Sequence, residues 1–281
     1  MATVVGIDIG GTKARLCVQG AGPERFEDFP TGAATDGARL AAEIRTRLEQ
    51  ASVVPAAIGI AVPGLVDGGR LVVSDVLPAL AGWTPADALA AGAAHVVVLN
   101  DAKAGLVEAA FGEAPDATVA LVMVGTGIGA AILVDGRPLR GASGWAGELG
   151  SIPIERDGRR VCLDDLASGA AILRACGLDP AALHARLAAG EPTAREVVQQ
   201  AGDALGVGLA TLVNLFNPGK LVLAGGTLRY PGYRLAATAA LERWALAPLL
   251  AACRVEVPAE GDRLVCRGAA RAARAASAGS R

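Results

Sequence analysis

The sequence has only two histidines, His95 and His184, and five scattered cysteines that form no Cys-x-x-Cys pair. Neither histidine lies near a group of cysteines, so a zinc site is not expected. Scattered cysteines in odd number are typical of small core residues in a reducing cytoplasm, not of a disulfide framework. The Gly-x-Ser-x-Gly pattern of many hydrolases is also missing, because residues 141–145 read Gly-Ala-Ser-Gly-Trp.

The net charge of the chain is small, and long uncharged runs are few. The formal net charge is −2, so nucleic acid and anionic membranes have no electrostatic attraction to this chain. The one long uncharged run, residues 117–134, is broken by glycines and therefore predicts strand–turn–strand and not a membrane span. No basic stretch precedes an apolar one at the start of the sequence. We therefore expect a cytoplasmic protein without a signal peptide and with no nucleic-acid or membrane partner.

Two glycine-rich loops, each between apolar runs, are the most informative feature of the chain. The first is Asp8-Ile9-Gly10-Gly11-Thr12-Lys13, and the second is Gly125-Thr126-Gly127-Ile128-Gly129. Two such turns that face each other could hold a polyphosphate with backbone N–H groups and hydroxyls. The repeat therefore favours a two-lobed nucleotide clamp over a single P-loop.

Each loop also has a simpler interpretation. In the first, Gly10 and Gly11 would let the backbone approach a phosphate, and Asp8 could hold Mg²⁺ through water, but an ordinary hairpin turn is the alternative. It is not a Walker A loop, because Gly-Lys-Ser/Thr is missing. The second also fits a Gly-x-Gly-x-x-Ala dinucleotide pattern, which should open a helix. The Asp135-Gly136 turn signal predicts a hairpin instead.

Three further segments carry candidate site residues. Asn100-Asp101-Ala102 closes the apolar run 95–99, where one polar residue could cap a helix and the carboxylate could accept the proton of an attacking hydroxyl. Glu148 stands among glycines, in what could equally be a solvated loop. Residues 225–227, Gly-Gly-Thr, follow a strand pattern and could lie against a base and ribose or form a plain strand-to-helix turn.

Hydrophobic periodicity predicts an α/β protein with mixed sheets. We place the lobe boundary near residues 112–116, which gives a smaller lobe at 1–114 and a larger one at 115–264. A helix at about 265–281 is expected to pack back on the first lobe, and a cleft is expected between the lobes. Its arginines (Arg267, Arg271, Arg274 and Arg281) are interpreted as a solvated face. Strands are predicted at 4–9, 14–18, 57–62, 95–99, 119–124, 130–134 and 221–223. Helices are predicted at 36–50, 85–91, 102–111, 168–176, 180–187, 193–214 and 231–241.

Taken in order, these segments resemble the ROK family of sugar kinases, within the actin/hexokinase superfamily. The matching pieces lie between residues 4 and 226. Besides the segments described above, they comprise Val62-Pro63-Gly64-Leu65-Val66-Asp67 and Asn217-Pro218. The resemblance implies a two-lobed, ribonuclease H-like α/β fold with an interlobe cleft. It further implies a phosphotransferase that moves the γ-phosphoryl of ATP, with Mg²⁺, to a hydroxyl of a sugar.

The resemblance assigns roles to residues of this sequence. Asp101 is the expected general base, and it is expected to bind the acceptor together with Gly64, Asn100, Glu148, Ser151 and Asp164. The ATP-binding set is Asp8, Gly10, Gly11, Thr12, Lys13, Thr126, Gly127, Gly225, Gly226 and Thr227. Magnesium is expected near Asp8, bound through water. A homodimer is expected from the resemblance alone.

Departures from the family pattern concern the acceptor side. Ser151 replaces the histidine of Glu-x-Gly-His, and only Cys162 remains of the zinc-binding cysteines, so structural zinc is expected to be absent. Asp164 stands where the family has a glutamate that contacts sugar, and Ala79 replaces an asparagine. These changes favour a modified hexose or a sugar-like cyclitol over plain glucose as acceptor, because lost polar partners reshape specificity strongly.

Other functions stay open at this point. A transcriptional repressor of the family would need an amino-terminal helix-turn-helix; because the first glycine loop follows the strand pattern that starts at Val4, we do not expect this function. A sugar-binding or sugar-sensing protein without catalysis is disfavoured by Asp101 together with both glycine loops. Polyphosphate as donor in place of ATP is compatible with the sequence.

Overall fold

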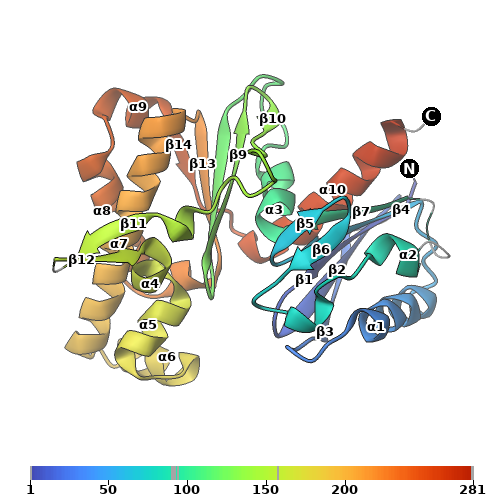
Figure 1. Ribbon diagram of the computed structural model, residues 1–281, viewed down its shortest axis with the longest axis horizontal. Helices are drawn as coiled ribbons and strands as arrows, with labels where there is room; N and C mark the ends of the chain where they lie inside the picture. The colour runs from blue at the N-terminus through green and yellow to red at the C-terminus, as the bar shows by residue number, and fades with distance from the viewer. Residues whose placement is uncertain (1, 90–92, 94, 157, 280–281) are drawn as a thin grey trace. The chain divides into compact units, whose positions relative to one another are not determined.

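The computed structural model describes residues 2–89, 93, 95–156 and 158–279. The chain forms two compact units, which are treated separately below (Figure 1). The first unit comprises Met1–Phe111, Arg140–Trp145 and Arg263–Arg281, and the second comprises Gly112–Leu139 and Ala146–Asp262. No helix within the described ranges is both long and apolar enough to cross a membrane.

The first unit is built on a mixed five-stranded sheet with the order β3-β2-β1-β4-β7. Strand β1 pairs antiparallel with β2 and parallel with β4. Because side chains alternate along a strand, Val5 and Ile7 belong to the core that also holds Leu40 and Ile44 of α1, while Gly6 faces the other way. The elements are β1 Val4–Ile9, β2 Lys13–Gln19, β3 Arg25–Pro30, α1 Gly37–Gln50, β4 Ala57–Val62, β5 Leu65–Asp67, β6 Arg70–Val73, η1 Pro78–Leu80, α2 Pro85–Leu89, β7 His95–Asn100, α3 Asp101–Ala109 and α10 Leu264–Gly279.

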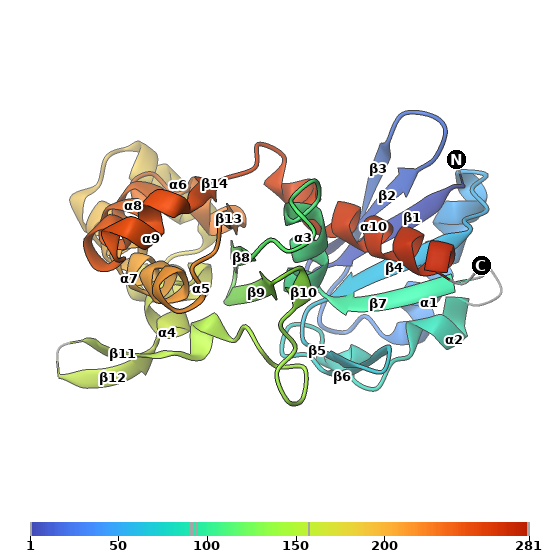
Figure 2. The same cartoon turned by 90° about the horizontal axis from the view of Figure 1, so that it is seen from above.

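Helix α10 lies against β1, β4, β7 and α3 of the first unit (Figure 2). Gly6 and Gly59 are register partners in β1 and β4. A Cβ atom on Gly6 would lie 1.9 Å from the carbonyl oxygen of Cys266, and one on Gly59 would lie 1.9 Å from that of Ala269. The missing side chains on the sheet therefore let the backbone of α10 touch the strands, and this close contact closes one face of the sheet.

The arginines of α10 are not a solvated face, so that sequence-based interpretation is wrong. Arg267 donates to Glu24 Oε2 from Nε at 2.9 Å and from Nη2 at 2.7 Å. Arg271 donates to Glu108 Oε2 at 2.8 Å and lies over the ring of Phe111. These contacts hold α10 to the loop before β3 and to α3, which explains the high arginine content of this end of the chain. Arg281 lies outside the described residues.

We expect Arg267→Ala to lower the free energy of unfolding by about 1 to 2 kcal/mol, because Glu24 would lose a charge-assisted partner in a partly buried place. Arg274→Ala is the matched control on the same helix, since its contacts to Ala2 O and Gln19 are both 3.4 Å long. Chemical denaturation of the three proteins measures the effect. Equal stability of the two variants would contradict this account of α10.

The second unit is built on a second mixed five-stranded sheet, with the order β10-β9-β8-β13-β14. Strands β8 and β9 form a hairpin through the second glycine loop, and β13 runs parallel to both β8 and β14. The elements are β8 Val119–Val124, β9 Ile128–Val134, β10 Arg137–Pro138, η2 Leu149–Ser151, β11 Pro153–Arg156, β12 Arg159–Cys162, α4 Leu163–Ala167, α5 Gly169–Cys176, α6 Pro180–Ala188, α7 Pro192–Phe216, β13 Lys220–Ala224, η3 Gly226–Arg229, α8 Tyr233–Trp244, α9 Ala247–Ala252 and β14 Arg254–Glu256, followed by η4 Gly261–Arg263.

The long helix α7 is the centre of the second unit's core. Its buried residues Val198, Leu205 and Leu209 belong to one apolar cluster with Val122 and Ile132 of the sheet. On the side of α8, Gly202 and Gly206 of α7 allow close packing, because a Cβ on Gly206 would lie 2.4 Å from the carbonyl oxygen of Ala237. This packed scaffold fixes the ends of β8 and β13, which carry the two glycine segments of the second unit.

Candidate functional site

The first glycine loop, residues 8–13, presents backbone amides. Gly10 N donates to Lys13 O at 2.9 Å, which closes the turn. Thr31 holds the loop from behind, since its hydroxyl donates to Gly10 O at 2.6 Å and its N–H donates to Thr12 O at 3.0 Å. The N–H groups of Gly11 and Thr12 donate no hydrogen bond within the described part of the chain. A loop with tied carbonyls and unused amides is suited to an anion.

Charges alternate across the strands beside this loop. Asp8 of β1 is the register partner of Arg15 of β2, and Arg15 is the partner of Asp28 of β3. Arg15 binds Asp28 through two hydrogen bonds, of 2.6 and 2.8 Å, and Lys13 Nζ also lies 3.0 Å from Asp28. These hydrogen bonds, led by that from Arg15, hold the pKa of Asp28 well below its usual range. The Lys13 charge expected for phosphates is thus shared with Asp28, a partner that the sequence pattern does not reveal.

Asp8 is the unusual acid of this cluster. Burial raises its pKa from 3.8 to about 7, with a further contribution from the negative charge of Asp101, while Arg15 and Lys13 act in the opposite direction. The negative charge of Asp101 that helps to raise the pKa of Asp8 would also attract a divalent cation to Asp8. No three His, Cys, Asp or Glu side chains gather as a metal site anywhere in the described ranges. A carboxylate oxygen is the kind of donor that Mg²⁺ prefers, so Asp8 is compatible with this ion if most of the other ligands are water.

Asp8→Asn should change how stability depends on pH. The unfolded chain ionises Asp8 near pH 3.8, whereas the folded protein keeps this proton up to about pH 7. Asp8 therefore makes the wild type lose stability as the pH rises from 4 to 7, and the variant escapes this loss. We expect the difference in Tm (variant minus wild type) to grow between pH 4 and 7 and to level off above pH 7. A thermal denaturation series without nucleotide or metal measures it, and a difference that stays flat over that interval would contradict the buried acid.

Asn100 and Asp101 stand at the start of α3. The side chain of Asn100 accepts from Ala102 N at 3.0 Å and Lys103 N at 3.3 Å, so the helix cap considered from sequence is confirmed. Its Nδ2 donates to Gly64 O at 2.9 Å, which joins the segment after β4 to this helix start. Asp101 Oδ1 accepts from Ala102 N at 2.8 Å, which fixes a partly exposed carboxylate at the end of β7. This places Gly64, Asn100 and Asp101 together in the first unit.

The second glycine loop repeats the arrangement of the first. Gly125 N donates to Gly127 O at 2.9 Å. From behind, Gly169 N donates to Gly125 O at 2.8 Å and Ala170 N donates to Thr126 O at 3.2 Å, both from the start of α5. The amides of Thr126 and Gly127 donate no hydrogen bond to any described residue, and both residues are exposed. The second unit therefore also offers a pair of backbone donors to an anion.

Residues 225–227 pack against the same loop. Gly225 has φ of 111°, and a Cβ there would lie 2.2 Å from Val124 O, so only glycine fits beside the end of β8. The Thr227 hydroxyl is buried and donates to Gly125 O at 3.0 Å. Thr227 therefore supports the second glycine loop from inside the protein, while Gly226 is exposed at the start of η3.

The expected acceptor residues of the second unit lie on two segments. Glu148 precedes the short helix η2, Ser151 is its last residue, and both are exposed. Asp164 lies in the first turn of α4, and its Oδ1 accepts from Ile128 N at 2.6 Å. Burial raises the pKa of Asp164, and the Ile128 N–H opposes that shift. Asp164 of α4 is thus hydrogen-bonded to the second glycine loop, a contact that the spacing of the sequence does not indicate.

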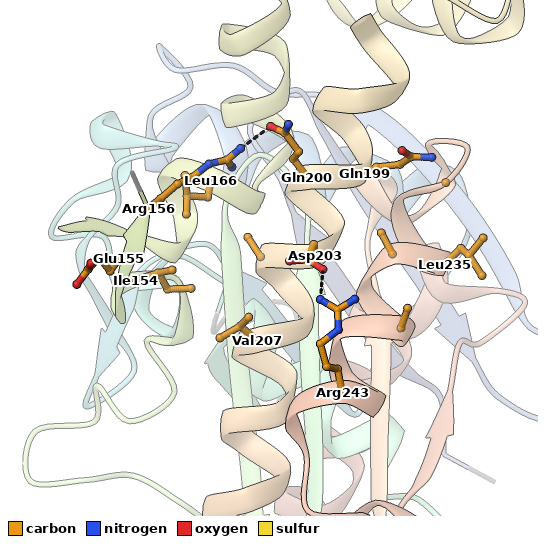
Figure 3. Close-up of a pocket in the computed structure, with 14 residues that line it drawn as sticks. Ile154, Glu155, Arg156, Leu166, Gln199, Gln200, Asp203, Val207, Leu235 and Arg243 are labelled. Carbon is orange, nitrogen blue, oxygen red and sulfur yellow. Dashed lines mark hydrogen bonds and ion pairs between the residues drawn. The ribbon is translucent and has the colours of Figure 1, made fainter. Parts of the chain in front are cut away.

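A separate concavity of about 620 Å³ lies between α7, α8 and the β11–β12 hairpin (Figure 3). Four of its polar side chains are paired with each other, since Arg156 donates to Gln200 and Arg243 lies 3.5 Å from Asp203. None of the residues expected to bind ATP or the acceptor lines it. This hollow is therefore not the site that the motifs indicate.

The residues that support the two glycine loops were not identified from the sequence. Thr31, Asp28 and Ser168 carry no motif, and Ser168 caps α5 by accepting from Ala171 N at 3.1 Å. A signal for Ser168 did exist, because serine before an apolar helical run is a common cap. Thr31 and Asp28 could only be found through the pairing of β2 with β3.

Comparisons with known proteins agree with these features. Kanosamine kinase of Amycolatopsis mediterranei is 29% identical over 245 residues, which cover 79% of this chain and 80% of that protein. The bifunctional enzyme NanE/NanK of Brucella melitensis is 31% identical over 250 residues, which cover 82% of this chain but only 46% of that protein. The chain thus matches about half the length of the bifunctional enzyme.

The fold comparison gives the same result over the whole chain. The crystal structure of ROK hexokinase from Thermus thermophilus superposes with a TM-score of 0.81 at 29% identity and covers 99% of both chains. The expected α/β fold of the actin/hexokinase type, with two mixed sheets, is therefore confirmed. A family model described as ROK family matches residues 4–276. The chain belongs to the ROK family of sugar kinases.

Proposed function

We propose that this protein is an ATP-dependent kinase that phosphorylates a hydroxyl of a hexose, a modified hexose or a sugar-like cyclitol. The observation that carries the proposal is the pair of glycine loops, one in each unit, with the same hydrogen-bond design. In both, the carbonyls are tied back and two adjacent amides are left for a ligand. A single anion loop would suit many proteins, whereas two of them suit a chain of phosphates.

Asp101 is the proposed general base. The acceptor oxygen would attack the γ-phosphorus, the bond from that phosphorus to the bridging oxygen of ADP would break, and the hydroxyl proton would pass to the Asp101 carboxylate. The hydrogen bond from Ala102 N orients this carboxylate. Asn100 and Gly64, joined by their own hydrogen bond, are proposed to bind other hydroxyls of the acceptor.

The nucleotide would be held mainly by backbone groups. Gly11, Thr12, Thr126 and Gly127 supply the amides that we assign to the phosphates. Mg²⁺, when bound near Asp8, would offset the negative charge of the phosphates. Residues 225–227 are proposed to lie by the adenosine, with Gly225 and Gly226 nearest to it, because the Thr227 hydroxyl is committed to Gly125.

The acceptor is the finer part of the proposal. Glu148 and Ser151 are exposed and available to an acceptor, whereas Asp164 is engaged with Ile128. The replacement of polar residues of the family pattern at Ser151, Asp164 and Ala79 favours an acceptor whose hydroxyl pattern differs from that of glucose. The relative named kanosamine kinase supports testing amino sugars early.

An ADP-release assay tests the proposal. Purified protein with Mg²⁺ and ATP is offered hexoses, amino sugars, N-acetylhexosamines and C7-cyclitols, each with a reaction lacking acceptor as control. We expect acceptor-dependent ADP release with at least one member and weaker turnover of glucose. No acceptor-dependent release, with ATP still bound in a separate titration, would favour the alternative of a sugar-binding protein without catalysis.

The same panel tests the donor. Polyphosphate replaces ATP in a second arm, and the phosphorylated acceptor is detected directly. Because the amides of both loops are assigned to phosphates and not to a base, polyphosphate is a specific second candidate. The expected homodimer and the absence of zinc stay predictions, which sedimentation and metal analysis of the purified protein would test.

A further inference from the structure

Asp164 occupies the point where three segments of the second unit meet. Its Oδ1 accepts the N–H of Ile128 at 2.6 Å, within the second glycine loop. A Cβ atom on Gly127 would lie 3.5 Å from this oxygen, and one on Gly150 would lie 3.1 Å from it. The carboxylate therefore fills the space between the second glycine loop, the helix η2 and α4.

Asp164 complements the other contacts of the loop. Gly169 N, Ala170 N and the Thr227 hydroxyl all donate to carbonyl oxygens of residues 125 and 126. Asp164 is different, because it accepts, and so it fixes the loop at its opposite end through an N–H group. Ile128 is buried, so no solvent molecule readily replaces the carboxylate. Fixed at both ends, the loop keeps the amides of Thr126 and Gly127 on its exposed side.

We propose that Asp164 is a positioning residue that orients the second glycine loop for the nucleotide phosphates, and that it is not a ligand of the acceptor. This inference rests on the proposed function, because it needs a nucleotide at the loop. It changes the role that the family resemblance implies for this position. The aspartate side chain reaches the Ile128 N–H at 2.6 Å, and an added methylene would move the carboxylate relative to that N–H.

Asp164→Ala and Asp164→Glu separate the two roles. Binding of Mg²⁺ with AMPPNP is measured by calorimetry without acceptor, and the KM values for ATP and for the acceptor are measured separately. We expect Asp164→Ala to weaken AMPPNP binding and raise the KM for ATP at least tenfold, with the acceptor KM unchanged within twofold. Asp164→Glu should also weaken nucleotide binding and bring no gain in acceptor KM, because the added methylene shifts the carboxylate relative to the Ile128 N–H.

Two further variants serve as controls for this experiment. Asp165→Ala is the matched control, since Asp165 stands in the same helical turn, is exposed and lies 3.6 Å from Arg174 in a solvent-accessible ion pair. It should leave every value unchanged. Asp164→Asn keeps an oxygen for the Ile128 amide and should retain most of the nucleotide affinity, which also decides the matter if the alanine variant does not fold.

Several results would overturn the inference. Asp164→Ala that binds AMPPNP like the wild type but has a raised acceptor KM would make Asp164 an acceptor ligand. So would Asp164→Glu with an improved acceptor KM. Asp164→Asn as weak as Asp164→Ala would contradict the hydrogen bond to Ile128 as the cause. A wild type that binds no nucleotide would instead overturn the proposed function itself, so the two failures are distinguishable.

Discussion

Asp101→Asn is expected to lower kcat by about 10²- to 10⁴-fold, the range that a positioned general base contributes. Asparagine keeps an oxygen that can accept the Ala102 N–H, so the start of α3 should stay intact. The nucleotide should still bind, because the amides assigned to its phosphates are unchanged. Steady-state ADP release gives kcat, and titration with AMPPNP gives the affinity.

Asp87→Asn is the control for this variant. Asp87 is an exposed carboxylate in the first turn of α2, in the same unit, and its loss should leave kcat within twofold. Removal of the Asp101 charge also takes away one cause of the raised pKa of Asp8. An Asp101→Asn variant with normal turnover would show that another group accepts the proton.

Gly59→Ala should destabilise the protein by about 3 kcal/mol or more, because added atoms in a packed contact force the backbone apart. The new Cβ would lie 1.9 Å from the carbonyl oxygen of Ala269 in α10. The helix would have to move away from the sheet, and with it the contacts of Arg267 and Arg271 would weaken. We expect a fall in Tm on the order of 10 °C.

Gly22→Ala provides the comparison. No heavy atom lies within 4 Å of a Cβ built on Gly22, so the same change there should alter stability by no more than about 0.5 kcal/mol. Thermal and chemical denaturation of both variants measure the difference. Equal stability of Gly59→Ala and Gly22→Ala would contradict the close contact between α10 and the sheet.

The sequence predicted the buried strands well. The predicted ranges 4–9, 57–62 and 119–124 agree with β1, β4 and β8, because continuous runs of buried apolar residues leave little choice of structure. Strand β3 was missed because its sequence, Arg-Phe-Glu-Asp-Phe-Pro, is largely charged and exposed. Strands β11, β12 and β14 were missed for the similar reason that they are short and partly exposed.

The ends of the helices were predicted less accurately than their positions in the chain. The helix predicted at 231–241 begins at Tyr233, because Gly232 takes a φ of 90° before it, and ends at Trp244. The helix predicted at 193–214 extends to Phe216, where Asn217 ends it in the left-handed region. Of the helix predicted at 85–91, residues Pro85–Leu89 are helical, and residues 90–91 lie outside the described residues.

The candidate site was predictable where glycine and carboxylate stand in motifs. Gly10, Gly11, Thr126 and Gly127 could be picked out from the local glycine pattern alone, because a glycine-rich turn after a strand is visible in a few consecutive residues. What surrounds them depends on long-range pairing, such as Thr31 behind the first loop and Asp164 at the second. The role of the arginines in α10 was missed for the same reason, because Glu24 and Glu108 are far away in sequence.

The most direct test of the central claim follows the phosphoryl group itself. ATP labelled with four ¹⁸O atoms at the γ-phosphate is incubated with Mg²⁺, the protein and the best acceptor of the panel, and the products are analysed by mass spectrometry. The account predicts a phosphorylated acceptor that carries three ¹⁸O atoms, in amounts equal to the ADP formed. Release of inorganic phosphate alone, or no turnover with any acceptor, would contradict it.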